Sequence, residues 1–127
     1  VGAVDAKKNN NDWEVYSHGG SKSTGIKAIE WIKNLEKLGV GEILLTSMNK
    51  DGTKEGFDLE LLCKASNEVS IPIIASGGVG KLSHFRDGVT KGKADALLAA
   101  SVFHFGELSI LKVKQYLYDE GLSVRID

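Results

Sequence analysis

Apolar residues along the chain fall into short runs separated by longer segments with helical spacing. The runs have the length of β-strands and recur at Val1 to Val4, Glu42 to Thr46, Pro72 to Ala75 and Asp95 to Ala99. A segment of helical periodicity follows each run, so the pattern predicts a βα unit repeated four times. Because the strands are apolar almost throughout, we expect a parallel sheet covered on both faces, which excludes an ordinary sandwich.

Four helices are predicted to follow these strands. The first has apolar residues at near-helical spacing from Ile26 to Leu38, with Thr24 as its cap and Gly39 at its end. Asp58 precedes the second helix. The third and fourth are predicted at about 82–90 and about 110–120, and they end at Gly92 and Gly121.

The number of units bears on the architecture. The segment Gly39 to Ser47 reads much like Gly92 to Ala100, as expected of modular βα units. Since about eight strands are needed to close a barrel, we predict that residues 1–127 form a single α/β domain, half of a (β/α)₈ TIM barrel with parallel strands. The sequence also begins inside a predicted strand, as a fragment would. Two open sheet edges predict self-association or pairing with a missing amino-terminal half-barrel.

Composition narrows the classes of partner. Of 127 residues, 42% are hydrophobic and 26% are charged, and the net charge is −1. Such a balance offers no basic face to nucleic acid and no polybasic segment to a membrane, and no apolar run approaches the roughly 18 residues of a spanning helix. A single cysteine, Cys63, and three histidines without metal-site spacing predict a cytoplasmic protein with no bound metal or cofactor.

Candidate chemistry lies where each strand passes into its loop, as is usual in parallel βα architectures. Asp5 ends the first strand, where a carboxylate suits proton transfer; the alternative is a helix cap or a solvated loop residue. The segment Ser76 to Gly78 offers bare backbone amides to a phosphate, although a tight turn needs such glycines too. Ala100 and Ser101 favour phosphate, because the last two loops of a barrel frequently form such a site.

Two connections are longer than the about 2 to 6 residues of a plain βα loop. The first, Thr46 to Gly56, contains Asp51 and Gly52, which by themselves predict only a turn, but its length favours substrate contact or a lid. The second, Lys7 to Thr24, contains the strand-like segment Trp13 to Tyr16 and suggests a small hairpin folded over the site.

Five motifs stand in order at the predicted strand ends. They are Val4 to Lys7, Gly41 to Ser47, Asp51 to Lys54, Ile74 to Gly78 and Ala99 to Phe105. Together they resemble the cyclase subunit of imidazole glycerol phosphate synthase. The resemblance runs through the whole chain but covers only the second half of that family's sequence, corresponding to strands 5–8 of its barrel.

The resemblance implies a lyase of histidine biosynthesis. In that family, ammonia delivered by a glutaminase partner attacks a bis-phosphorylated ribulosyl aminoimidazole carboxamide nucleotide, giving imidazole glycerol phosphate and an aminoimidazole carboxamide ribotide. Two aspartates carry the proton transfers, and Asp5 matches one of them; the other belongs to the half that this sequence lacks. Because one aspartate and one phosphate clamp are missing, we expect the chain alone to have little or no cyclase activity.

The resemblance also implies roles for residues outside the strand that carries Asp5. Thr46, Asp51 and Gly52 match substrate-facing positions, while Ser76, Gly77, Gly78, Ala100 and Ser101 supply the phosphate-binding loops. Glu42 matches a charged ring at the foot of the barrel, where ammonia enters from the glutaminase. The segment Gly19 to Lys22 departs from the family pattern and leaves the details of its loop open.

Three alternatives remain. The sister isomerase of the same pathway has similar phosphate loops, but Ala99 to Phe105 argues for the cyclase. A cyclase-like paralogue pairs with an amidotransferase in surface glycan synthesis. The third alternative is a half-barrel that serves only as an assembly unit without activity.

Overall fold

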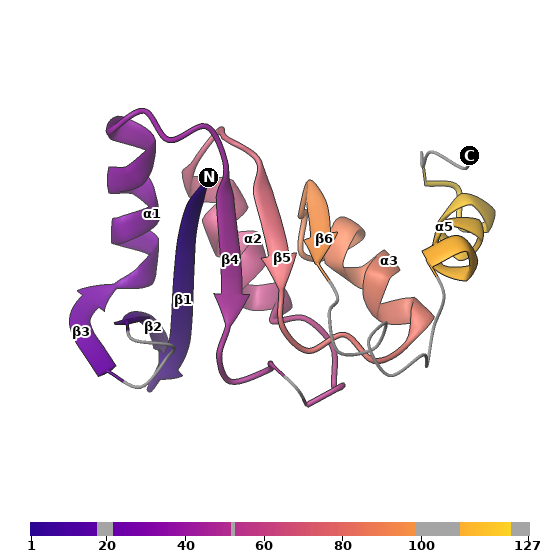
Figure 1. Cartoon of the computed structure of the whole chain (residues 1–127), viewed down its shortest axis with the longest axis horizontal. Coiled ribbons are helices and arrows are strands. Elements are labelled where there is room, and N and C mark those ends of the chain that lie inside the picture. Colours follow the sequence, from indigo (N-terminus) through magenta and orange to yellow (C-terminus); the bar gives the residue numbers. More distant parts are fainter. Residues whose placement is uncertain (18–21, 52, 99–109, 123–127) are drawn as a thin grey trace.

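A computed structural model describes residues 1–17, 22–51, 53–98 and 110–122 of the chain. Within them, one sheet has the strand order β3-β2-β1-β4-β5-β6 (Figure 1). Its strands are β1 (Gly2–Asn9), β2 (Asp12–Ser17), β3 (Lys22–Lys27), β4 (Ile43–Ser47), β5 (Ile73–Ser76) and β6 (Ala96–Leu98). The helices are α1 (Ala28–Lys37), α2 (Leu59–Glu68), α3 (Leu82–Thr90) and α5 (Ile110–Asp119).

Four strands form the parallel part of the sheet. β1 pairs with β4, β4 with β5, and β5 with β6, all in parallel, and each strand leads on to a helix later in the chain. These are the four strands that the apolar runs predict. The α/β architecture of a partial (β/α)₈ barrel is therefore confirmed.

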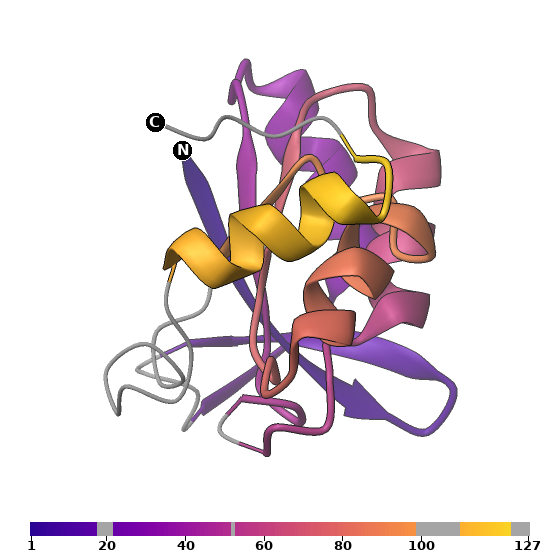
Figure 2. The ribbon, with the colours of Figure 1, turned by 90° about the vertical axis from the view of Figure 1, so that its right-hand side faces the viewer.

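The two faces of this sheet differ in what covers them. Alternate residues such as Val4, Leu45 and Ala75 point to one face and are at most 1% exposed. Helices α1, α2 and α3 lie on that side of the strands (Figure 2), and α5 packs against α3. On the other face Ala3 and Ala96 are exposed. The prediction that both faces of the sheet are covered is therefore wrong for the described part of the chain, in which α1, α2 and α3 cover a single face.

The hairpin predicted within Lys7 to Thr24 is present but lies elsewhere than expected. β2 pairs antiparallel with β1, and β3 pairs antiparallel with β2, so the hairpin widens the sheet beside β1. β1 consequently continues to Asn9, well past the predicted end at Val4, because its last residues find partners in β2. The turn between the strands uses Asn10 at φ 58°, a conformation that asparagine tolerates better than most residues.

The predicted start of the first helix is wrong. Thr24 and Ile26 belong to β3, and helix α1 begins only at Ala28. Instead of capping the helix, the Thr24 hydroxyl donates a hydrogen bond to the Val15 carbonyl of β2 at 2.7 Å. Strand pairing therefore overrides the local helical periodicity of this segment.

The other helices begin where their sequence predicts. Asp58 caps α2, and its carboxylate accepts a hydrogen bond from the Leu61 amide at 3.1 Å. At the far end of α2, the Glu36 carboxylate of α1 accepts bonds from the Ser70 amide at 2.8 Å and the Ser70 hydroxyl at 2.9 Å. No helix in the described ranges is long and apolar enough to cross a membrane.

Candidate functional site

Three predicted site residues lie side by side at the carboxyl ends of the parallel strands. Thr46 of β4 is the register partner of Asp5 on one side and of Ser76 on the other. Neighbouring strands lie about 4.8 Å apart, and register partners point to the same face. All three side chains are half-buried and belong to the uncovered face. The structure thus brings a carboxylate and two hydroxyls together in one row.

An apolar row lies directly beneath this polar row. Ala3, Leu44, Ile74 and Ala96 are register partners across the same four strands. Leu44 and Ile74 are half-buried, whereas both alanines are exposed. The uncovered face therefore has a polar end at the strands' carboxyl termini and an apolar floor.

A lysine and a tyrosine flank Asp5, and neither is among the site residues predicted from the sequence. Tyr16 of β2 is the register partner of Asp5, and Lys7 lies two residues further along β1 on the same face. The Lys7 ammonium sits 5.5 Å from the centre of the Tyr16 ring. The two-residue spacing of Asp5 and Lys7 signals a shared face, but only the pairing with β2 reveals Tyr16.

The glycines after β5 form a buried turn packed against the preceding loop. Gly77 and Gly78 have φ values of 101° and 104°, a region that favours glycine. A Cβ atom on Gly77 would lie 2.7 Å from the Ser47 carbonyl oxygen, and the Gly56 amide donates a hydrogen bond to the Gly78 carbonyl at 2.7 Å. The loops after β4 and β5 are therefore joined through their backbones.

The remaining predicted residues lie apart from this row. Asp51 is exposed in the loop after β4, where its amide donates a hydrogen bond to the Ser47 carbonyl at 2.9 Å. Glu42 directly precedes β4, at the opposite end of the strands from Asp5. Gly52, Ala100 and Ser101 lie outside the described residues.

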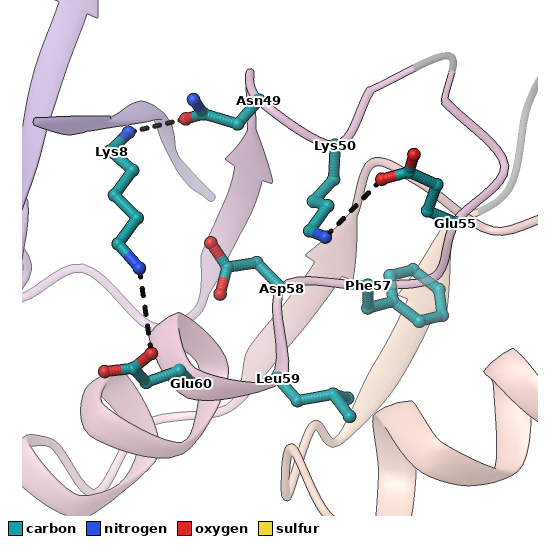
Figure 3. Close-up of a pocket in the computed structure, with 8 residues that line it drawn as sticks. All are labelled: Lys8, Asn49, Lys50, Glu55, Phe57, Asp58, Leu59 and Glu60. Atoms are coloured by element: carbon teal, nitrogen blue, oxygen red, sulfur yellow. Dashed lines mark hydrogen bonds and ion pairs between the residues drawn. The ribbon is translucent and has the colours of Figure 1, made fainter.

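A separate pocket of about 440 Å³ lies near the amino end of α2 (Figure 3). Its cations are matched by acids, since Lys8 approaches Glu60 at 3.9 Å and Lys50 approaches Glu55 at 3.8 Å. Its lining is Lys8, Asn49, Lys50, Glu55, Phe57, Asp58, Leu59 and Glu60. None of these is a predicted site residue, and both lysines of the lining approach an acid of the same pocket.

The hairpin is fastened beside this pocket by a buried tryptophan. Trp13 is 1% exposed, and its indole N–H donates a hydrogen bond to the Asp58 carboxylate at 2.9 Å. The ammonium groups of Lys8 and Lys64 lie 5.6 Å and 4.9 Å from the Trp13 ring centre. Because Asp58 also caps α2, one carboxylate connects the hairpin to the helix.

The polar groups around Asp5 suit proton transfer and anion binding. Within the described ranges, no three histidine, cysteine or acidic side chains gather in a group that could hold a metal ion. Asp5 has a hydroxyl neighbour on β4 and a cation on its own strand. A carboxylate in such surroundings can exchange protons with a substrate that is held by hydroxyls and backbone amides.

The chain matches a known protein family over most of its length. Residues 1–109 match the family model described as histidine biosynthesis protein. The match includes all four parallel strands and every predicted site residue from Asp5 to Ser101.

Proposed function

Because this chain belongs to the family of histidine biosynthesis proteins, we propose that its four βα units form the carboxyl-terminal half of the cyclase subunit of imidazole glycerol phosphate synthase. The family consists of TIM-barrel enzymes of histidine biosynthesis. The proposal rests on the row of Asp5, Thr46 and Ser76, which lies on the uncovered face at the carboxyl ends of the parallel strands. Active sites of (β/α)₈ barrels lie at this end of the strands.

The row suits the ring closure that the proposal requires. Asp5 gives and takes protons as ammonia adds to the nucleotide and the imidazole ring forms. Thr46 and Ser76 present hydroxyls to the substrate, and the amides of Gly77 and Gly78 receive one of its phosphates. Lys7 adds positive charge beside Asp5, which favours a doubly phosphorylated substrate. A second acid or base comes from the other half of the barrel.

The uncovered face supports the partners in the proposal. The apolar floor of Ala3, Leu44, Ile74 and Ala96 gains burial when four further strands complete the barrel, from an amino-terminal half or a second copy. The glutaminase docks at the opposite end of the strands, where Glu42 lies. Ammonia then crosses the barrel interior to reach Asp5.

The test mixes the purified chain with the amino-terminal half of a cyclase barrel and measures ammonia-dependent turnover of the bis-phosphorylated nucleotide. Activity is expected from the mixture, with little or none from the chain alone. Asp5→Asn should lower the activity of the mixture by about 100-fold or more, the contribution of a general acid or base. Asp119→Asn is the matched control, because Asp119 is exposed at the end of α5.

Each alternative gives a different result in this assay. Isomerase activity without ammonia consumption would assign the chain to the sister enzyme of the pathway. Inactive mixtures that still form the complete barrel would favour the paralogue of glycan synthesis or an assembly unit. Full turnover by the Asp5→Asn variant would remove this residue from the mechanism.

A further inference from the structure

The ring of His84 accepts two backbone hydrogen bonds at the start of α3. Its Nδ1 atom accepts from the Gly80 amide at 2.9 Å and from the Lys81 amide at 3.2 Å. An imidazole nitrogen that accepts hydrogen bonds carries no proton, so the ring is neutral with its proton on Nε2. His84 thereby satisfies amides at the end of the glycine segment that begins at Gly77.

The same ring lies against the loop after β4. A Cβ atom on Gly56 would lie 3.3 Å from Cδ2 and 3.5 Å from Nε2 of His84, so only a residue without a side chain fits here easily. Gly56 has φ 114° and donates its amide to the Gly78 carbonyl. Gly56 thus contacts the His84 imidazole on one side and the backbone of the glycine turn at Gly78 on the other. We call this contact between the loops after β4 and β5 the joint.

A second close contact lies next to the ring. A Cβ atom on Gly80 would lie 2.6 Å from the Lys54 carbonyl oxygen, so the two loops touch through their backbones here too. Gly80 is also the residue whose amide His84 holds. Any shift of the His84 ring therefore moves the position where both loops meet.

From these contacts we propose that His84 is a positioning residue, which locks the loops after β4 and β5 together so that the Gly77 and Gly78 amides are held ready for phosphate. The inference rests on the proposed function for the identity of the anion. His84 itself does not touch the substrate in this proposal; it acts through the backbone of Gly80 and Gly56. The joined loops directly follow the strands that carry Thr46 and Ser76.

The charges around the ring favour its neutral form. Burial and the nearby Lys81 lower the pKa of His84 below its ordinary value of 6.5, and Asp87 opposes this shift. Across the joint, Lys54 and Glu55 are the charged residues that directly precede Gly56. Because the folded pKa is lowered, the stabilisation from the neutral ring is fully present above pH 6.5 and is lost as the pH falls through the folded pKa.

The direction of the pH effect on anion binding distinguishes a positioning role of His84 from direct electrostatic attraction between His84 and the anion. A protonated histidine near an anion would strengthen binding in acid, since it adds a positive charge. Protonation of Nδ1 instead removes the acceptor for the Gly80 and Lys81 amides. Acid should therefore weaken anion binding at the glycine turn, even though the protein becomes more positive.

The test uses the whole 127-residue chain, labelled with ¹⁵N, and inorganic sulfate, whose charge stays constant over the pH range used. Amide shifts of Gly77 and Gly78 report the sulfate Kd, and hydrogen exchange of the Gly56 and Gly80 amides reports the joint. In wild type the Kd should rise several-fold between about pH 7.5 and about pH 5.5. His84→Leu should raise it about tenfold at neutral pH, as expected for the loss of one or two net hydrogen bonds.

His84→Gln is the conservative variant, because glutamine at this third helical position can also accept a hydrogen bond from the cap amide and does not titrate. Its Kd should stay close to that of wild type and should not change with pH. Equal exchange protection of Gly56 and Gly80 in wild type and His84→Leu would overturn the inference. The same acid weakening in His84→Gln as in wild type would also overturn it, and this comparison holds if the leucine variant does not fold.

Failure of the proposed function is distinguishable from failure of the joint. If sulfate shifts neither glycine amide in wild type, the phosphate site is wrong. Loss of Gly56 and Gly80 protection in His84→Leu would still support the locking of the two loops. If sulfate binds wild type and His84→Leu equally well, the phosphate site stands and the positioning role of His84 is wrong.

Discussion

Replacing Gly78 with alanine tests the joint between the two loops most directly. An added Cβ would lie 2.1 Å from the Gly56 carbonyl oxygen and 2.9 Å from the Lys50 Cβ, so the backbones must separate. Gly39→Ala is the matched control. Gly39 has φ 91°, close to the 104° of Gly78, but nothing lies within 4 Å of its added Cβ.

The two variants share one energetic cost and differ in the rest. An L-residue at such a φ costs about 1 to 2 kcal/mol, which applies to both. Gly78→Ala adds about 1 to 3 kcal/mol of overpacking and about 1 kcal/mol for the hydrogen bond from Gly56, so it should be about 2 to 4 kcal/mol less stable than Gly39→Ala. With an m-value of about 2 kcal/mol/M, urea midpoints should differ by about 1 to 2 M.

Urea unfolding followed by far-UV circular dichroism measures this difference. Gly41→Ala provides the baseline, since its added Cβ meets nothing within 4 Å and its φ is not positive. Equal midpoints for Gly78→Ala and Gly39→Ala would refute the reasoning, because backbone strain alone would then account for both variants.

Three further predictions concern single side chains. Ser47 is 2% exposed, and its buried hydroxyl has no hydrogen-bond partner among the described residues. Ser47→Ala should therefore raise the urea midpoint slightly, and a clear decrease would reveal a partner. Trp13→Phe should cost about 1 to 3 kcal/mol, because the Asp58 carboxylate loses its indole donor, and a thermal melt equal to that of wild type would contradict this. Hydrogen bonds from Ser70 lower the pKa of Glu36 below its ordinary 4.5, so the stabilisation from its carboxylate is present above pH 4.5 and is lost as the pH falls through the folded pKa. Glu36→Gln should therefore have a lower Tm than wild type at neutral pH, and the difference in Tm should close in acid. A difference in Tm that does not depend on pH would count against this reasoning.

Local signals predicted the elements whose ends are set by neighbouring residues. The third helix was predicted from about Leu82 to Thr90 and has those bounds, and Asp58 caps the second as expected. Capping and apolar periodicity act within one turn of a helix, so they can be read from a short window of sequence. The four parallel strands were found for a similar reason, because each is a short apolar run of strand length.

Pairing between distant segments was not predictable from such windows. Thr24 and Ile26 look like the start of a helix, yet they join a strand because β2 offers hydrogen bonds at that edge. The contact of His84 with Gly56 joins residues far apart in sequence, and nothing near either residue signals it. The place of Tyr16 beside Asp5 likewise depends on the register between β1 and β2.

Alternation along the parallel strands also limits how such a protein can change over evolutionary time. In β4, Leu45 belongs to the core while Thr46 belongs to the candidate site, so adjacent residues serve stability and chemistry separately. Inserting one residue within a strand would exchange the two sets and destroy both at once. Insertions after the strands leave the alternation intact. New substrate preferences should therefore arise through changes in loop length and through point substitutions on the uncovered face, while strand length stays constant.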